Sequence, residues 1–282
     1  MVGAEGLTNF GEGRPVVCRL LGYVAERPTS VVEVLGEEGF DAFTSLTAVH
    51  ADGWGMAWHD PAEPMTARCA LSPDSAVRDP TYVNLAHRRL GPAGLVHLRW
   101  ATGGLPVAAR NTHPFVEGGY AFAHNGHVAP LDRLEGLLTA DSRNRIQGDT
   151  DSERYFRFLL QSIEETAGDE QEGVTQALRT LRAEFPKSSL NALLLTPSRM
   201  FAVHINSRAI APPPALREMF SSGEDIPTGH DEDYFAMDYR VERDAVHVIS
   251  SGLDESGWLP VPGDLAVMVD LRTRERTSLD LT

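Results

Sequence analysis

VCRLLGY, at residues 17–23, is the first predominantly apolar run of the chain. Residues 18–24 combine β-permissive apolar side chains with little polarity, and they therefore predict a buried strand. Further along, Ser30 followed by Glu33 has the spacing of a capping box, in which two side chains satisfy backbone N–H groups where a helix begins. This pattern predicts a short helix that is closed by Gly36. We expect the fold to begin with a strand followed by a helix.

Short apolar runs on both sides of a helical middle predict the rest of the fold. Thr150 and Glu153 form a second capping box that opens one helix, and apolar residues at helical spacing from Val174 to Phe185 predict another. Strands are predicted at residues 54–59, 95–100, 120–124, 190–196, 200–205, 245–250 and 265–271, and a long surface connection at residues 212–233. Strands, then helices, then strands are typical of an α+β layered domain rather than a doubly wound one.

The length of 282 residues is compatible with one large domain or two small ones. Residues 1–16 are rich in glycine and have no sustained apolar period, which is typical of a flexible leader. The motifs described below are spread from residue 18 to residue 153 without a linker between them. We therefore predict a leader at residues 1–17 and a single domain at residues 18–282.

The charge of the chain argues against two classes of partner. Its 40 acidic and 25 basic side chains give a formal net charge of -15, which would repel phosphate backbones and anionic membrane surfaces. No apolar run approaches the roughly 20 residues that span a bilayer, and the first residues lack the basic start and apolar core of a signal peptide. We expect no nucleic-acid partner, no membrane association and a cytoplasmic location.

The two cysteines, Cys18 and Cys69, cannot build a disulfide framework, which fits a reducing cytoplasm. The sequence contains no His-Glu-x-x-His pattern, no paired Cys-x-x-Cys motif, no phosphate-binding loop and no dinucleotide fingerprint. We therefore predict neither a metal nor a cofactor.

Cys18 is the candidate nucleophile. A cysteine attacks an amide as its thiolate, and because the pKa of a free thiol is about 8.5 it needs a neighbouring base or a positive field. Taken alone, Cys18 would be a small buried residue on a strand, which is the more common fate of a free cysteine. Cys69 has no motif in its company and is predicted to be structural.

Two further motifs offer groups that could bind an amide substrate. His124-Asn125-Gly126 provides a side-chain amide and an approachable backbone N–H for a tetrahedral oxyanion, although Asn-Gly is also a common turn between strands. Arg99 and Thr102 can bind a carboxylate, and Asp151 can bind an ammonium at the start of a helix. In isolation, Arg99 would be a solvated charge at a strand end and Asp151 an ordinary acid at a helix N-terminus.

The full set of motifs resembles the class II glutamine amidotransferases, enzymes whose nucleophile is a cysteine at the very N-terminus of the mature chain. The residues that carry the resemblance are Cys18, Arg99-Trp100-Ala101-Thr102, Asn111-Thr112-His113-Pro114-Phe115, His124-Asn125-Gly126 and Gly148-Asp149-Thr150-Asp151-Ser152-Glu153. The resemblance is strong from residue 18 to residue 163. Beyond residue 163 it rests only on the arrangement of the remaining predicted strands. It implies the N-terminal nucleophile hydrolase fold, a four-layer αββα sandwich with two stacked antiparallel sheets.

The resemblance also implies roles for individual residues. Cys18 would attack the side-chain amide, Asn125 and Gly126 would bind the oxyanion, and Arg99, Thr102 and Asp151 would bind the amino-acid end of glutamine. His113 would shape the pocket wall, and we expect it to be a hydrogen-bonded structural histidine rather than a general base. Asp52-Gly53-Trp54-Gly55 is also similar to the family, where glycines let the backbone pass close to the nucleophile, but a hairpin turn beside a buried tryptophan explains it equally well.

One feature departs from the family. In the mechanism of N-terminal nucleophile enzymes the α-amine of the cysteine acts as the base, whereas Cys18 follows Val17 in an amide bond. Three explanations exist: a misassigned start, a cleaved leader or an inactive protein. We favour the first, because a GTG codon for Val17 could serve as an initiator read as methionine, whose removal would expose Cys18.

The predicted function is hydrolysis of glutamine to glutamate and ammonia through a cysteine thioester. No synthetase domain is evident in the sequence, and in this respect the chain resembles the stand-alone branch of the family. That branch includes the γ-glutamyl hydrolase of ergothioneine synthesis, so a γ-glutamyl small molecule is a second candidate substrate. A separate synthetase or acceptor protein would then use the ammonia. The sequence is also compatible with a non-catalytic subunit that keeps its leader, and with a papain-like cysteine hydrolase using His113 or His124.

Overall fold

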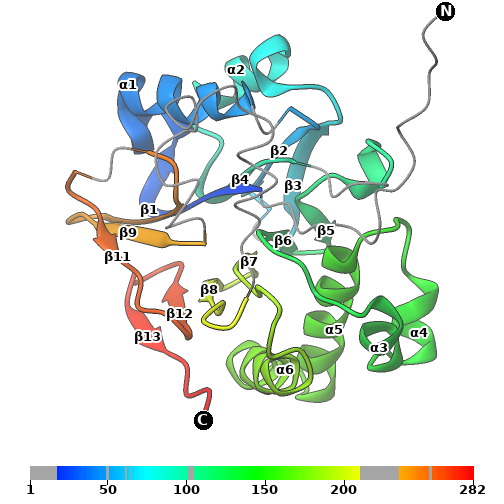
Figure 1. The fold of residues 1–282 in the computed structure, drawn as a ribbon. Helices are drawn as coiled ribbons and strands as arrows, with labels where there is room; N and C mark the ends of the chain where they lie inside the picture. Colours follow the sequence, from blue (N-terminus) through cyan, green and yellow to red (C-terminus); the bar gives the residue numbers. More distant parts are fainter. Residues whose placement is uncertain are drawn as a thin grey trace, which may run out of the picture.

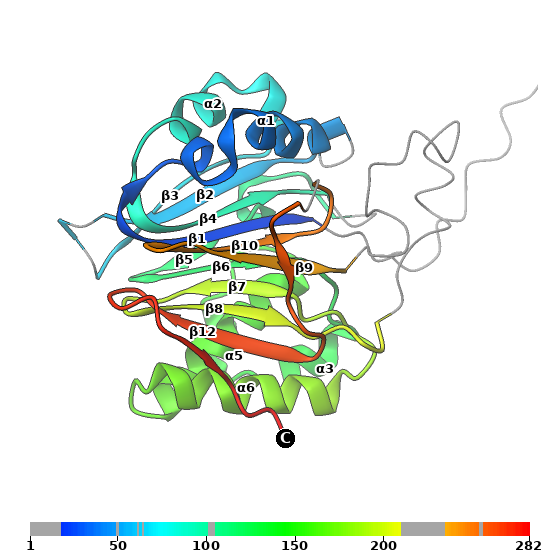
Figure 2. The same ribbon diagram turned by 90° about the vertical axis from the view of Figure 1, so that its left-hand side faces the viewer.

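Two antiparallel sheets lie face to face between two layers of helices (Figures 1 and 2). The computed structural model describes residues 18–48, 51–60, 62–63, 65–100, 105–209, 235–253 and 256–282. The helices α1 (Val31–Ser45) and α2 (Pro80–Ala86) cover one sheet, and α5 (Asp151–Glu165) and α6 (Glu170–Glu184) cover the other. The predicted four-layer αββα sandwich of the α+β class is therefore confirmed.

Both sheets combine pairs of consecutive strands with pairs of strands that are distant in sequence, such as β1 with β10. In the described residues the first sheet has the order β11-β9-β10-β1-β4-β2-β3, with bounds β1 Arg19–Thr29, β2 Trp54–His59, β3 Ala67–Ser72, β4 Gly91–Leu98, β9 Met237–Val241, β10 Ala245–Ser250 and β11 Leu259–Pro260. The second has the order β13-β12-β8-β7-β6-β5, with bounds β5 Phe115–Glu117, β6 Tyr120–His124, β7 Ala192–Leu195, β8 Arg199–His204, β12 Leu265–Asp270 and β13 Arg276–Ser278. Shorter helices are α3 Leu131–Gly136 and α4 Ala140–Asn144, with 3₁₀ turns at Leu46–Ala48, Ala76–Arg78 and Ala109–Asn111.

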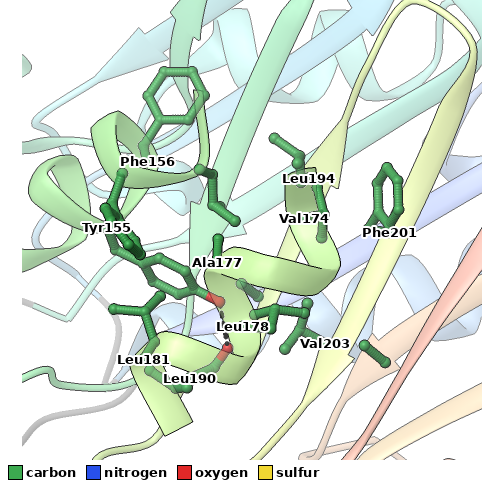
Figure 3. Close-up of a cluster of buried hydrophobic side chains, with 14 of the residues drawn as sticks. Tyr155, Phe156, Val174, Ala177, Leu178, Leu181, Leu190, Leu194, Phe201 and Val203 are labelled. Atoms are coloured by element: carbon green, nitrogen blue, oxygen red, sulfur yellow. Dashed lines mark hydrogen bonds between the residues drawn. The ribbon is translucent and has the colours of Figure 1, made fainter. Parts of the chain in front are cut away.

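Each interface between layers has its own apolar cluster. Figure 3 shows one of them, where Tyr155 and Phe156 of α5 and Leu178 of α6 pack toward Phe201 and Val203 of β8. Burying a leucine or phenylalanine side chain contributes about 1.5–3 kcal/mol, so three such clusters hold the four layers together. The candidate site residues therefore lie at the ends of strands and at the start of a helix, and these elements are held in place by the apolar clusters.

The first helix differs from its prediction. The Ser30 and Glu33 capping box is present, but the helical segment does not end at Gly36. Gly36 breaks the helical geometry with a φ of 76°, a value that costs glycine little, and the chain then resumes as helix to Ser45. The second segment buries Phe40 and Phe43 against the sheet, and this burial favours continuing the helix.

At the start of α5, one of the two hydrogen bonds of the predicted capping box is present. The Thr150 hydroxyl accepts a hydrogen bond from the Glu153 N–H at 3.2 Å, as predicted. The Glu153 carboxylate, however, accepts from the N–H groups of Gln147 and Gly148 at 2.9 and 2.7 Å, instead of turning back to the cap residue. Glu153 therefore ties down the loop that leads into α5.

Several strands match their predicted bounds, and others do not. Residues 54–59, 120–124 and 245–250 are strands as predicted, whereas the strand predicted at 95–100 begins at Gly91 and ends at Leu98. The predicted leader at residues 1–17 and the whole predicted connection at residues 212–233 lie outside the described residues. In the part of the chain that is described, no helix is long and apolar enough to cross a membrane.

Candidate active site

The antiparallel pairing of β1 and β4 places Cys18 beside Arg99 and Trp100. Arg19 is the register partner of Leu98, so the residue before β1 lies next to the residues after β4. The Cys18 sulfur accepts a hydrogen bond from the Trp100 N–H, with 3.5 Å between sulfur and nitrogen. The thiol donates a hydrogen bond to the Trp100 carbonyl oxygen, which lies 3.6 Å from the sulfur. The sheet register alone therefore brings the candidate nucleophile and the candidate carboxylate-binding residue together.

Cys18 is 7% exposed, and its burial has a chemical consequence. Burial raises the pKa of the thiol to about 11, although the Trp100 backbone and the Arg99 guanidinium act to lower it. At neutral pH the thiol is protonated, because its pKa lies well above the solution pH. A reaction at this sulfur therefore requires a base that removes the proton.

Arg99 brings a buried positive charge to the site. Its guanidinium donates to the carbonyl oxygens of Asp52 and Pro106 at 3.1 and 3.5 Å, and the side chain is mostly buried. It forms no salt bridge with a carboxylate of the described residues. Burial lowers the pKa of Arg99, but an arginine remains charged at neutral pH. A carboxylate-bearing ligand would supply the missing counter-ion.

The second sheet contributes the end of β6, where His124 is locked in one tautomer. His124 Nε2 lies 2.9 Å from the Ser189 carbonyl oxygen, and because a carbonyl can only accept, Nε2 carries the proton. His124 Nδ1 then accepts from the Ser152 hydroxyl at 2.9 Å. Burial lowers the pKa of His124, so the ring is neutral and links β6 to the start of α5.

Asn125 and Gly126 follow directly and have unused hydrogen-bonding groups. The Asn125 side chain is fully buried, and in the described residues neither its amide nitrogen nor its oxygen has a hydrogen-bond partner. Leaving such a group unpaired costs about 1–3 kcal/mol. The Gly126 N–H likewise donates to none of the described residues. A Cβ at Gly126 would lie 2.2 Å from the Ser189 carbonyl oxygen, so this position has no room for a side chain. Gly126 lines the cavity described below, so its N–H can donate to a ligand there.

Asp151, the first residue of α5, is a buried carboxylate. Its Oδ2 accepts from the Val128 N–H at 2.6 Å and lies 3.5 Å from Nδ1 of His127. Burial acts to raise the pKa of Asp151, but His127, His124 and the Val128 N–H outweigh it and hold the pKa below its usual value. The carboxylate is therefore ionised at neutral pH and can bind a cation.

His113 and Asn111 come from the loop between β4 and β5. The His113 ring packs on His97 and Phe115 with centroid distances of 4.3 and 4.7 Å, and in the described residues its nitrogens have no hydrogen-bond partner. The predicted hydrogen-bonded histidine is thus held by ring packing instead. Burial keeps the pKa of His113 well below its usual value, so the ring is neutral.

Asn111 was not predicted as a site residue on its own account. Its amide nitrogen donates to Pro106 O and Asp149 Oδ2, both at 3.1 Å, and its oxygen accepts from the Asp149 N–H at 2.8 Å. Because Pro106 O also accepts from Arg99, this amide joins the Arg99 loop to the loop that starts α5.

The glycines of the 52–55 segment make a different contact from the one that the resemblance implies. A Cβ at Gly55 would lie 2.1 Å from the His113 carbonyl oxygen, so the close approach is to the His113 loop rather than to Cys18. The tryptophan between the glycines, Trp54, is buried and donates to Asp79 at 3.0 Å.

Most of the predicted residues meet at one small cavity. The cavity has a volume of about 30 Å³, room for one or two water molecules, and is lined by Cys18, Arg99, Trp100, Leu105, Asn111, His113, His124, Gly126, Thr150, Asp151 and Ser152. Asn125 is not among the lining residues, and Thr102 lies outside the described residues. Six lining residues were not among the predicted site residues: Trp100, Leu105, Asn111, His124, Thr150 and Ser152. All of them except Leu105 stand inside the quoted motifs, and that position is the only signal that could have indicated them.

Size does not distinguish this cavity, but chemistry does. A larger cavity of about 400 Å³ beside the end of α6 contains none of the predicted residues. In the part of the chain that the structure describes, no three His, Cys, Asp or Glu residues are grouped as a metal site. The small cavity brings together a thiol, a carboxylate, a backbone N–H without an acceptor and a guanidinium, and the guanidinium has no carboxylate partner among the described residues. These are the chemical groups that recognition and attack of an amino-acid amide require.

Comparisons with known proteins indicate one enzyme family. The model of the class II glutamine amidotransferase family matches residues 17–220. A Haemophilus influenzae protein, named as a candidate glutamine amidotransferase, is 30% identical over 156 residues, which cover 54% of this chain and 49% of the relative. The glutamine–fructose-6-phosphate aminotransferase of Mycobacterium leprae is 29% identical over 182 residues, which cover 62% of this chain and 28% of that enzyme.

A solved structure agrees at the level of the fold. The structure of a glutamine aminotransferase class-II domain protein from Silicibacter pomeroyi covers 93% of this chain and 99% of its own, with a TM-score of 0.60 and 18% identity. The aligned regions span about half or less of the curated relatives' own lengths. On the match of the family model over most of the sequence, the chain belongs to the class II glutamine amidotransferases.

Proposed function

We propose that the protein hydrolyses the side-chain amide of glutamine to glutamate and ammonia through a thioester on Cys18. The observation that carries this proposal is the cavity at which the Cys18 thiol, Arg99, Gly126 and Asp151 meet. Each group corresponds to one requirement of the reaction: a nucleophile, a carboxylate-binding cation, an oxyanion donor and an ammonium-binding anion.

The base in this proposal is the α-amine of Cys18. An α-amine has a pKa of about 7.7–8.0, so it is partly unprotonated at neutral pH and can accept the proton of the buried thiol. That amine exists only if the chain starts at Cys18, and we therefore propose that residues 1–17 are absent from the active protein and that residues 18–282 form its catalytic domain.

The proposed reaction has two steps, formation of a thioester on Cys18 and its hydrolysis by water. The Cys18 sulfur attacks the amide carbon, and the negative charge moves to the oxygen, which accepts from Asn125 and Gly126. Each such donor contributes about 2.7–4 kcal/mol to transition-state stabilisation. The amine returns its proton to the leaving nitrogen, and ammonia departs. Water, activated by the same amine, then attacks the thioester, releases glutamate and restores the thiol.

Recognition in this proposal depends on the two buried charges. Arg99 binds the α-carboxylate, with Thr102 adding a hydroxyl, and Asp151 binds the α-ammonium. His113 forms part of the wall through its ring packing. These groups contact only the γ-glutamyl end of a substrate, so a γ-glutamyl amide, as used by the stand-alone branch that includes the ergothioneine-pathway hydrolase, would be bound equally well.

A substrate comparison tests the proposal. The protein, with its first residue determined by mass spectrometry, is incubated with L-glutamine, L-γ-glutamylmethylamide and L-asparagine, and the released amine and amino acid are measured. We expect hydrolysis of one or both γ-glutamyl compounds and none of asparagine, whose shorter side chain cannot place its amide at Cys18 while the charged groups are bound. A protein that starts at Cys18 and hydrolyses neither γ-glutamyl compound would contradict the proposal, whereas a retained leader with no hydrolysis would favour a non-catalytic subunit.

A further inference from the structure

The carboxylate of Asp151 already has a second charged neighbour besides any substrate. Both contacts of Asp151 are made by Oδ2, which accepts from Val128 N–H at 2.6 Å and lies 3.5 Å from His127 Nδ1. No described residue donates a hydrogen bond to Oδ1. Asp151 lines the cavity with Cys18, whereas His127 does not belong to the lining and its side chain is 33% exposed. The ring therefore approaches the carboxylate from a side other than the cavity.

The other charged groups near Asp151 do not play the same role. His124 from β6 and His113 from the loop before β5 are buried, and burial lowers the pKa of each, so both are neutral. Arg99, after β4, is held by the carbonyl oxygens of Asp52 and Pro106, and Asp149, before α5, is paired with Arg110 at 3.0 Å. His127 alone in this set can gain a proton near neutral pH, because the Asp151 carboxylate raises its pKa.

We propose that His127 is a specificity-determining residue that acts as a resident counter-cation of Asp151 and competes with the α-ammonium of the substrate. The inference rests on the proposed function, in which Asp151 binds that ammonium. When His127 is protonated, two cations share one carboxylate and repel each other. When His127 is neutral, Asp151 has its full charge available for the substrate.

Reciprocity gives the inference a second consequence. If protonation of His127 weakens substrate binding by some factor, substrate binding must weaken protonation of His127 by the same factor. The Val128 N–H holds Oδ2 whether or not the imidazole is charged, so the carboxylate keeps its place when the ring titrates or is replaced. A replacement at His127 should therefore change the pH dependence of binding rather than abolish binding.

The test compares the wild-type protein with His127→Gln in steady-state kinetics with L-glutamine between pH 5.5 and pH 8. We expect the KM of the wild type to rise about tenfold as the pH falls over this range, and the KM of His127→Gln to stay within about twofold. The kcat profiles should coincide, because His127 touches neither the thiol nor the amide. The control substrate, 4-carbamoylbutanoate, has the carboxylate and amide but no ammonium, and its KM should show no His127-dependent pH effect.

The outcomes separate the inference from the proposed function. Parallel KM profiles in wild type and His127→Gln, with Asp151→Asn still raising the KM for glutamine, would overturn the role of His127 and leave the proposed function standing. Absence of glutamine turnover in a wild type that starts at Cys18 would overturn both. Should His127→Gln fail to fold, nuclear magnetic resonance of the wild-type His127 ring decides: saturating L-glutamate should lower its pKa by about one unit, and an unchanged pKa would refute the competition.

Discussion

The buried thiol of Cys18 contrasts with Cys69, the exposed cysteine on β3. Because the reaction forms its bond at Cys18, Cys18→Ala should abolish amide hydrolysis while the circular dichroism spectrum stays unchanged. Cys69→Ser, the matched control, should keep kcat/KM close to that of the wild type, since Cys69 does not line the cavity. Loss of activity in Cys69→Ser with full activity in Cys18→Ala would reverse the assignment.

Replacement of Asn125 should affect catalysis much more than the stability of the fold. Its fully buried side-chain amide has no hydrogen-bond partner among the described residues, so the folded state gains little from it. Replacing an oxyanion donor lowers kcat by about 10²–10³. We predict a loss of this size for Asn125→Ala, with a change in the free energy of unfolding below about 1 kcal/mol, measured by urea denaturation. A strongly destabilised variant that keeps its kcat would show that Asn125 is structural.

At the scale of the elements, the approach of the His113 loop to β2 depends on a missing side chain. A Cβ on Gly55 would lie 2.1 Å from the His113 carbonyl oxygen, whereas nothing lies within 4 Å of a Cβ on Gly136 in α3. Overpacking of this kind costs about 1–3 kcal/mol, and alanine in a compatible helical position gains about 0.4–1 kcal/mol. Gly55→Ala should therefore unfold at lower urea concentration and Gly136→Ala at equal or higher concentration. Equal midpoints for Gly55→Ala and the wild type would contradict the close contact.

Local patterns predicted the elements where burial and periodicity agree. The strand at residues 54–59 is buried at nearly every position, and α6 shows its apolar face in Val174, Leu178 and Leu181. The strand β3 was missed because its burial is partial and its pattern weak. Gly36 was misread because a glycine that ends a helix and a glycine that interrupts one have the same local sequence.

The sequence predicted those site residues that stand in recognisable motifs, but not the contacts between them. Cys18, Arg99, His113, Gly126 and Asp151 stand in motifs, and the structure places all of them around one cavity. Other contacts join residues that are distant in the chain: Ser152 bonds to a histidine 28 residues away, and Asn111 to an aspartate 38 residues away. No spacing rule encodes such pairs, because they depend on how β6 and the loop before β5 meet the start of α5.

At the scale of the whole molecule, His247 makes stability depend on pH. Burial and the neighbouring Arg240 guanidinium lower the pKa of His247 to about 4. Since the unfolded chain has an ordinary histidine pKa of about 6.5, it binds more protons than the folded state between these values, and stability falls as the pH drops through this window. His247 should account for about 2 kcal/mol of the loss between pH 7 and pH 5.

Urea denaturation of wild type and His247→Gln at both pH values checks this expectation. The variant, which cannot titrate at this position, should lose about 2 kcal/mol less than the wild type between pH 7 and pH 5. Identical losses in the two proteins would show that another group controls the pH dependence.

The four layers bring two sheets and one helix to a common point, and the proposed reaction needs Cys18 to be both the nucleophile and the first residue there. Peptide mass spectrometry of the catalytically active protein, after inactivation by the glutamine analogue 6-diazo-5-oxo-L-norleucine, measures both properties at once. We predict that the analogue is attached to a peptide that begins at Cys18, with the modification on that residue. A modification on Cys69, or residues 1–17 still joined to Cys18 in a fully active preparation, would contradict the account.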